Sequence, residues 1–261
     1  MHTGQILAEL RQSRRISQLD LALLAEVSSR HLSFIETGRS QPSPTMLKRL
    51  ASELALSCRD TNRLLLSAGY APAFSETDLD SETMAPVRAA LEVMLSNHNP
   101  FPAVVLDAHW NVLMANESQL QLVSMMIQER GPLPPTHNVI ELVFHPQGYR
   151  PFLVNWEDVA AFLLRRIQRD HQARPDPALA RLLETLGELA DLDSLRQRYP
   201  ETSALEPMLT LELEVAGQRL RSFSTIASFG TALDVVMEEL RIEHYFPADE
   251  TTRRWFRNQI Q

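Results

Sequence analysis

The sequence has little of what several classes of protein require. Its 261 residues contain one cysteine, Cys58, so no disulfide can form within the chain, and this fits a reducing cytoplasm. The N-terminus has no apolar run of the signal-peptide kind, and no stretch approaches the roughly 20 apolar residues of a membrane span. We therefore expect a cytoplasmic protein that does not contact a membrane.

Motifs of catalysis are missing as well. The chain has eight glycines and no Gly-x-Ser-x-Gly elbow, no phosphate-cradling glycine loop and no Gly-x-Gly-x-x-Gly. Its eight histidines form no His-x-x-x-His pair and no Cys/His pair at ligand spacing. Glu157 and Asp158 are adjacent carboxylates in the first turn of a predicted helix, where they favour the helix dipole. We expect no enzyme activity, no metal site and no cofactor.

Charge is distributed unevenly along the chain, whose formal net charge is -8. Residues 1–70 hold nine Arg and Lys against six Asp and Glu, whereas the remainder holds 16 against 27. A basic N-terminal part can approach phosphates, and an acidic remainder avoids them. This division favours a nucleic-acid-binding module followed by a body with another task.

Residues 17–38 predict two short helices joined by a tight turn. Ser17 with Asp20 has the form of a capping box, Ser28 caps the second helix, and Gly38 follows as a left-handed stop. The outward side chains of the second helix form a small polar set suited to base edges in a major groove. These candidate base contacts are Ser28, Ser29, Arg30, His31, Ser33 and Phe34.

Individual roles follow from the chemistry of these side chains. Arg30 is expected to read a guanine, while Phe34 either touches a thymine methyl group or belongs to the core. Other polar side chains are placed to contact phosphates and fix the register on the duplex. These candidate phosphate contacts are Gln18, Arg39, Gln41 and Arg11.

Two motifs in this region carry a resemblance to a known family. Ser-Gln-x-x-Leu-Ala at 17–22 and Ser-x-x-His-Leu-Ser-x-Ile-Glu-x-Gly-Arg-Ser-x-Pro-Ser at 28–43 resemble the helix-turn-helix of the Xre/Cro–C1 repressors. An ordinary helical hairpin is the alternative. The resemblance implies a five-helix DNA-binding bundle in which Arg11 pairs with Glu36; otherwise these two are unrelated surface charges.

Leu19, Leu23 and Leu24 do not fit the inward face of the first of these two helices, which Leu21, Ala22 and Ala25 fill. We predict that a second subunit or the acidic body covers part of this surface. The alternative is that the three leucines extend into the groove beneath the fourth helix.

The remainder of the chain alternates between strand and helix patterns. We predict domains at 1–72 and 99–261, with a linker and connector helix at 73–98. Runs at 103–107 and 110–115 indicate a hairpin, and 211–215 with 220–229 a second strand pair. Residues 235–246 fit strand or helix, and we favour a strand. Helices are predicted from Glu117, Trp156 and Pro177, and Asn116 and Asp249 are predicted N-caps.

This half carries a second resemblance. The segments at 99–107, 111–116, 155–160 and 246–249 resemble the MmyB-like ligand-binding domain, a PAS-related sensor found behind Xre-type modules in bacteria. The expected fold is therefore a two-domain chain, an all-α bundle followed by an α+β PAS-like domain with a mainly antiparallel sheet. The resemblance implies a pocket for a small apolar ligand such as a fatty acid.

Candidate pocket residues are the large aromatic, thioether and aliphatic side chains of this half, many of which must also build the core. They are Phe101, Val105, Trp110, Met114, Leu122, Met125, Met126, Phe144, Phe152, Trp156, Phe162 and Phe223. His145, Arg150 and Arg166 are candidate anchors for a ligand carboxylate.

Together these features predict a bacterial one-component transcription regulator. A homodimer would place two recognition helices about 34 Å apart, and so prefer an inverted-repeat operator on double-stranded DNA. Two other classes remain as alternatives. One is an enzyme with a regulatory helix-turn-helix, which would need a catalytic constellation. The other is a DNA-binding protein whose second domain binds a protein partner through a flat apolar patch.

Overall fold

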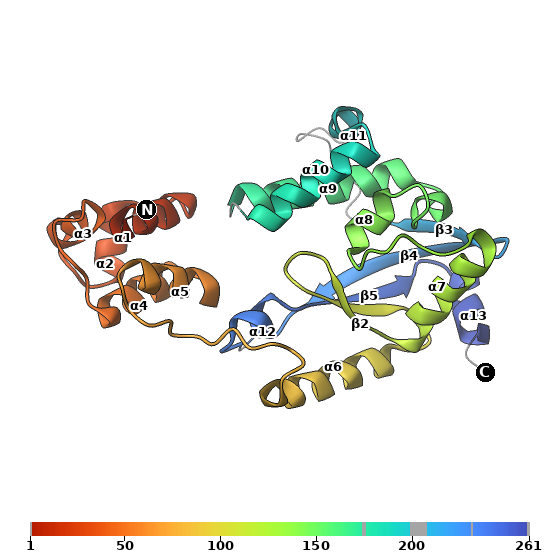
Figure 1. Ribbon diagram of the computed structural model, residues 1–261, viewed down its shortest axis with the longest axis horizontal. Coiled ribbons are helices and arrows are strands. Elements are labelled where there is room, and N and C mark those ends of the chain that lie inside the picture. The colour runs from red at the N-terminus through yellow and green to blue at the C-terminus, as the bar shows by residue number, and fades with distance from the viewer. Residues whose placement is uncertain (1, 174–175, 199–207, 231, 260–261) are drawn as a thin grey trace. The chain divides into compact units, whose positions relative to one another are not determined.

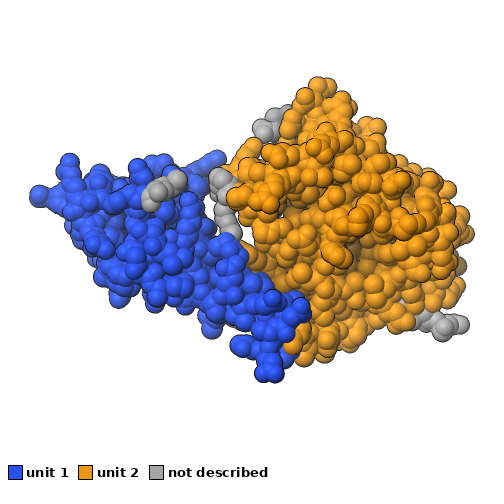
Figure 2. Space-filling model, viewed as in Figure 1, with its two compact units in different colours: residues 1–85, 229–238 blue, residues 86–228, 239–261 orange. Residues whose placement is uncertain are grey.

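The computed structural model describes residues 2–173, 176–198, 208–230 and 232–259. The chain divides into two compact units, coloured separately in Figure 2. Residues 1–85 and 229–238 make up the N-terminal unit, and residues 86–228 and 239–261 make up the C-terminal unit. This division differs from the predicted domains because residues 229–238 join the N-terminal unit.

Within residues 2–85, five α-helices form the bundle that the sequence predicts (Figure 1). They are α1 (Thr3–Ser13), α2 (Gln18–Leu24), α3 (Ser29–Glu36), α4 (Pro44–Glu53) and α5 (Cys58–Ser67), and a short 3-10 turn, η1 (Glu82–Met84), follows. Helices α2 to α5 each begin after a serine whose hydroxyl accepts from the backbone N–H three residues on, so their starts are fixed locally. The caps are Ser17, Ser28, Ser43 and Ser57.

The core of this bundle consists of inward-facing leucines at helical spacing. A leucine has high helix propensity, and removing its side chain from water contributes roughly 1.5–3 kcal/mol. Sequence-local signals and burial therefore favour the same structure. The fully buried members include Leu7, Leu21, Leu32, Leu47, Leu50 and Leu64.

The C-terminal unit is built on a five-stranded sheet of order β2-β1-β5-β4-β3. Its strands are β1 (Ala103–Leu106), β2 (Val112–Ala115), β3 (Leu211–Val215), β4 (Gln218–Ala227) and β5 (Arg241–Pro247). Every neighbouring pair is antiparallel. The two predicted strand pairs are confirmed as β1–β2 and β3–β4, the latter joined at Ala216 and Gly217, whose φ values of 51° and 69° suit a tight turn.

Helices flank this sheet (Figure 1). They are α6 (Ala85–His98), α7 (Glu117–Arg130), α8 (Val139–Phe144), α9 (Trp156–Ala173), α10 (Pro177–Leu189), α11 (Leu192–Arg198) and α13 (Glu250–Gln259), with a 3-10 turn η2 (Arg150–Phe152). The predicted caps are confirmed: Asn116 accepts from the N–H of Gln119, and Asp249 from that of Thr252. Residues of α8, α9 and α10 share one core with Val104 and Leu106 of the sheet.

The strand predicted over residues 235–246 is wrong in its first half. Helix α12 (Val235–Glu239) occupies that half, and β5 begins only at Arg241. The carboxylate of Asp234 accepts hydrogen bonds from the N–H groups of Val236 and Met237, so it caps a helical turn. The apolar pattern alone does not distinguish a helix from a strand over these residues.

Residues 229–238, which we call the crossover segment, leave the sheet after β4 and join the N-terminal unit before β5 begins. Asp234 lies at their centre and accepts from the Ser75 hydroxyl at 2.7 Å. The carboxylate of Glu238 accepts from the backbone N–H of Cys58, at the start of α5, at 2.7 Å. The crossover segment is thus fastened to the helical bundle by buried and half-buried polar contacts.

Candidate functional site

The outward face of α3 presents the polar side chains that the sequence predicts. Ser29 and Arg30 are exposed and His31 and Ser33 are partly exposed, while Leu32 and Ile35 are buried beneath them. The cap at Ser28 makes Ser29 the first residue of the helix, so its N-terminal turn carries this polar set. An accessible helix of this kind is what a major groove admits.

Phe34 lies partly exposed at the edge of this face. The guanidinium carbon of Arg30 is 5.4 Å from its ring centroid and that of Arg39 is 6.0 Å away, so two cations flank one aromatic ring. Of the two roles predicted for Phe34, burial in the core is not what the structure shows. The ring instead lies next to two positively charged side chains beside α3.

The predicted pair between Arg11 and Glu36 is confirmed. Two nitrogens of the Arg11 guanidinium contact the two carboxylate oxygens of Glu36 at 2.7 and 3.0 Å, and a third donates to the Ile16 carbonyl at 2.8 Å. Gln18 also donates to Glu36, at 3.0 Å. Hydrogen bonding to Glu36 raises the pKa of Arg11. Arg11 therefore ties α1, α2 and α3 together from the interior, a position that does not favour contact with a phosphate.

The other predicted phosphate contacts lie at the surface. Arg39 and Gln41 are exposed in the loop between α3 and α4, and Gln18 is partly exposed in the first turn of α2. Their contact with DNA stays a prediction.

The exposed leucines of α2 are not covered within the bundle. Leu19, Leu23 and Leu24 are 59%, 68% and 51% exposed, so they do not fill a groove beneath α4, and that alternative is wrong. The prediction that a second subunit or the acidic body covers them stays open.

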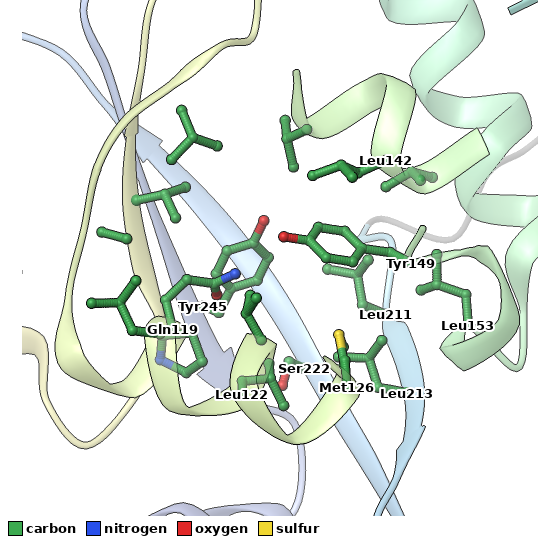
Figure 3. Close-up of a pocket in the computed structure, with 18 of the residues that line it drawn as sticks. Gln119, Leu122, Met126, Leu142, Tyr149, Leu153, Leu211, Leu213, Ser222 and Tyr245 are labelled. Atoms are coloured by element: carbon green, nitrogen blue, oxygen red, sulfur yellow. The ribbon is translucent and has the colours of Figure 1, made fainter. Parts of the chain in front are cut away.

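A cavity of about 250 Å³ lies in the C-terminal unit between one face of the sheet and the helices α7 and α8 (Figure 3). Its walls are mainly aliphatic. Alternate residues of a strand face opposite sides of a sheet, and the register shift in the β1–β2 pair lets both Val112 and Ala115 of β2 line the cavity. Among the lining residues are Val104, Val112, Ala115, Leu211, Leu213, Ser222 and Tyr245 from the sheet, Gln119, Leu122 and Met126 from α7, and Val139, Leu142 and Val143 from α8.

Of the twelve predicted pocket residues, Leu122 and Met126 line this cavity and the other ten do not. Val105 and Phe223 stand one residue out of phase with the lining residues of their strands, so they face the opposite side of the sheet. Met114 is paired with Val105 and faces the same side as Val105. The remaining seven build the core or lie elsewhere in the unit: Phe101, Trp110, Met125, Phe144, Phe152, Trp156 and Phe162.

The three predicted carboxylate anchors also lie away from the cavity wall. The Arg150 guanidinium stacks 3.8 Å from the Trp156 ring centroid and donates to the Leu189 carbonyl. That of Arg166 lies 4.8 Å from the Trp110 ring centroid. His145 accepts from the backbone N–H of Gln147. Each has a local structural contact, which its residue type alone does not reveal.

Polar groups that the sequence does not single out meet inside the cavity. Tyr149 precedes η2, Tyr245 belongs to β5, and Figure 3 shows their hydroxyl groups turned toward each other. Burial raises the pKa of Tyr149 to about 12, against a hydrogen bond with Gln119 that lowers it. Burial and the neighbouring Glu243 carboxylate raise the pKa of Tyr245 well above its usual range. Both phenols are therefore neutral at physiological pH.

Two features are absent from the parts of the chain that the structure describes. Within them, no group of three or more His, Cys, Asp or Glu side chains is placed to hold a metal ion. No helix there has the length and apolar character needed to cross a lipid bilayer.

Comparison with known proteins gives independent information. Residues 87–258 match the family model described as the MmyB-like transcription regulator ligand binding domain, and residues 7–60 match the helix-turn-helix family. The chain is 38% identical over 74 residues to an uncharacterized HTH-type transcriptional regulator, RghRB, of Bacillus subtilis (strain 168). This match covers 28% of the chain and 51% of that relative, so the chain spans about half the relative's length.

Among solved structures, an RNA-binding light-oxygen-voltage receptor is similar at 11% identity with a TM-score of 0.27. That match covers 98% of this chain and 61% of the receptor chain. A likeness at this level carries no argument about what the chain binds.

Proposed function

This chain belongs to the MmyB-like transcription regulators that carry an N-terminal helix-turn-helix, and on that premise we propose that a small aliphatic ligand in its C-terminal unit adjusts operator binding. The observation that carries this proposal is the aliphatic cavity between the sheet and helices α7 and α8. A cavity of this kind favours a small-molecule sensor over a domain that binds a protein partner through a flat surface.

The DNA-binding step rests on α3. The helix offers Arg30 and its neighbouring serines to base edges, while Arg39 in the following loop contacts phosphates. A bacterial homodimer with two α3 helices about 34 Å apart would prefer an inverted repeat. The exposed leucines of α2 are available as part of the dimer interface.

The sensing step rests on the wall of the cavity. Aliphatic side chains from strands β1, β2 and β3 and from helices α7 and α8 surround it, and apolar ligand surface gains roughly 25 cal/mol per Å² when it leaves water. A single alkyl chain, as in a fatty acid, suits such a wall. Met126 adds an adaptable side chain that accepts chains of different length.

The coupling step rests on chain connectivity. Ser222 of β4 and Tyr245 of β5 line the cavity, and the crossover segment that joins these two strands belongs to the N-terminal unit. A ligand that moves β4 against β5 therefore acts on residues fastened to Cys58 and Ser75. It shifts operator binding only to the extent that its affinity differs between the two arrangements.

Native mass spectrometry of the full chain purified from cells tests the sensing step. Ala115→Phe places a ring in the cavity, whereas Met114→Phe, one residue earlier on β2, faces the other side of the sheet and serves as the matched control. The wild type and Met114→Phe should retain an aliphatic ligand or bind added twelve- to eighteen-carbon chains, and Ala115→Phe should not. Equal binding by both variants, or no binding by a folded wild type, would contradict the proposal.

A further inference from the structure

The polar end of the cavity holds one hydroxyl group that is ready to donate. The hydrogen bond between Gln119 and Tyr149 lowers the pKa of the phenol, which means that the amide N–H donates and the phenol oxygen accepts. The proton of Tyr149 is therefore not used in that bond. Because the hydroxyl points into the cavity, it can donate to an acceptor on a ligand (Figure 3).

The second hydroxyl has the opposite character. Tyr245 is hydrogen-bonded to the carboxylate of Glu243, two residues earlier on β5, and a carboxylate only accepts. The Tyr245 hydroxyl consequently donates its hydrogen bond to Glu243. Its oxygen keeps its lone pairs, and because Tyr245 lines the cavity they can accept a hydrogen bond from a ligand. One tyrosine thus supplies a donor and the other an acceptor at the same place.

Positive charge is scarce at this end of the cavity. Among the described side chains that line it there is no arginine or lysine, and His137 is the lining residue that could carry a positive charge. The Arg166 guanidinium acts on Glu243 and is stacked on Trp110, outside the lining. A ligand carboxylate beside the two tyrosines would lose its hydration without gaining a cation.

An acidic side chain already lies at this place. Glu243 is cross-strand neighbour to Val104 and Ile226, on the same face of the sheet as Tyr245. Burial raises the pKa of Glu243 above its usual value, although hydrogen bonds from Ser224 and Tyr245 and the charge of Arg166 lower it in part. A second carboxylate at the tyrosine hydroxyls would approach this buried acid, and two such groups in one site oppose each other's ionisation.

We propose that the cavity selects an aliphatic ligand whose head group is uncharged and both accepts and donates a hydrogen bond, as a hydroxyl or a primary amide does. The head group lies between Tyr149, which donates to it, and Tyr245, which accepts from it. This inference rests on the ligand-sensing function proposed above and specifies the ligand's chemical class. It excludes the ionised fatty acid as the preferred ligand.

The test compares probes that share one twelve-carbon chain. Dissociation constants of 1-dodecanol, dodecanamide, dodecanoate and dodecylamine are measured with the full chain at pH 8 by displacement of the neutral fluorophore N-phenyl-1-naphthylamine. Dodecanol and dodecanamide should bind at least about tenfold more tightly than dodecanoate, since a factor of ten corresponds to about 1.4 kcal/mol, a modest cost for an unpaired buried charge.

Two variants assign the roles of the hydroxyls. Tyr149→Phe removes the donor and should weaken both dodecanol and dodecyl methyl ether by about tenfold. Tyr245→Phe removes the acceptor and should weaken dodecanol alone, because the ether has no proton to donate. Tyr70→Phe, which removes a hydroxyl bonded to the Pro42 carbonyl in the N-terminal unit, is the matched control and should change neither.

The outcomes separate this inference from the function on which it rests. Tighter binding of dodecanoate or dodecylamine than of dodecanol would overturn the neutral head group but leave the aliphatic sensor intact. Equal effects of Tyr149→Phe and Tyr245→Phe on the ether would overturn the assigned roles. Failure of all four probes to bind a folded wild type would refute the sensor itself.

Discussion

The buried ion pair of the helical bundle gives the sharpest prediction about stability. Arg11 and Glu36 have side chains that are 11% and 8% exposed, and their paired hydrogen bonds join α1 to α3. Replacing Glu36 by Gln keeps the size of the side chain but leaves the guanidinium charge buried without its partner. Little water reaches the Arg11 guanidinium to solvate its charge in place of Glu36.

The magnitude follows from that burial. Breaking one partner of a buried pair costs about 3–5 kcal/mol, whereas replacing both partners by apolar side chains of similar volume is often close to neutral. Glu36→Gln and Arg11→Met should each lower the local stability of α1 and α3 by about 3 kcal/mol or more. The double variant Arg11→Met with Glu36→Leu should lose much less than the sum of two such changes.

Hydrogen exchange followed by mass spectrometry on the full chain measures this without assuming one unfolding transition. Peptides from α1 and α3 should lose roughly two orders of magnitude in protection in Glu36→Gln. Glu26→Gln is the control, because Glu26 pairs with Arg49 at the surface, where the side chains are 78% and 40% exposed, and such pairs contribute about 0–1 kcal/mol. Equal losses of protection in Glu36→Gln and Glu26→Gln would contradict this prediction. A double variant that loses as much protection as Glu36→Gln and Arg11→Met combined would contradict it as well.

Three further predictions concern other parts of the molecule. Arg30→Ala should cost about 1–3 kcal/mol in operator affinity and relax specificity at one base, while Arg39→Ala should weaken binding to operator and to random DNA alike. Equal losses of affinity for both variants on both DNAs would contradict these roles. Gly4→Ala should lower the midpoint of thermal unfolding and loosen the packing of α1 against α3, because a Cβ atom there would overlap the backbone carbonyls of α3 residues 35 and 36. An unchanged midpoint would contradict this prediction, because it would show that the two helices can separate without loss of stability. The pKa of Asp234 lies below its usual value because hydrogen bonds from Ser75 and other groups outweigh burial. This carboxylate therefore stabilises the crossover segment above about pH 4, and that stability is lost as the pH falls through the lowered pKa. Hydrogen-exchange protection of residues 234–238 should fall at that pH in the wild type, and a protection profile that does not depend on pH would contradict this.

Much of the N-terminal unit could be predicted because its signals are local. The serine caps act within three residues of themselves, and the inward leucines recur at helical spacing. Even the long-range pair of Arg11 and Glu36 was accessible, through the resemblance of the motif that contains Glu36. Its consequence for Gln18, which also donates to Glu36, was not accessible because it depends on how α2 packs.

The cavity was harder because residue type does not reveal which side of a sheet a side chain faces. Val105 and Val104 are chemically alike and adjacent, yet only Val104 lines the cavity, and the choice is made by strand pairing far along the chain. The same holds for Tyr149 and Tyr245, which are 96 positions apart in the sequence and line the same cavity only once the C-terminal unit is folded. Large aromatic residues were the natural candidates, but most of them fill the core.

Residues 235–246 show the same limit in secondary structure. Their apolar pattern fits both helix and strand, and the carboxylate of Asp234 decides for α12, whereas antiparallel pairing with β1 and β4 decides for β5. The crossover segment also belongs to the N-terminal unit, and no local sequence pattern predicts this.

The operator affinity of the full chain with and without ligand tests most directly whether a ligand in the C-terminal unit adjusts DNA binding. An operator is selected from random duplex DNA, and its dissociation constant is measured with and without saturating 1-dodecanol for the wild type, Met114→Phe and Ala115→Phe. We expect this dissociation constant to shift by about fivefold or more in the wild type and Met114→Phe, and not to shift in Ala115→Phe. An operator affinity that dodecanol leaves unchanged, in a wild-type protein shown to bind both, would contradict it.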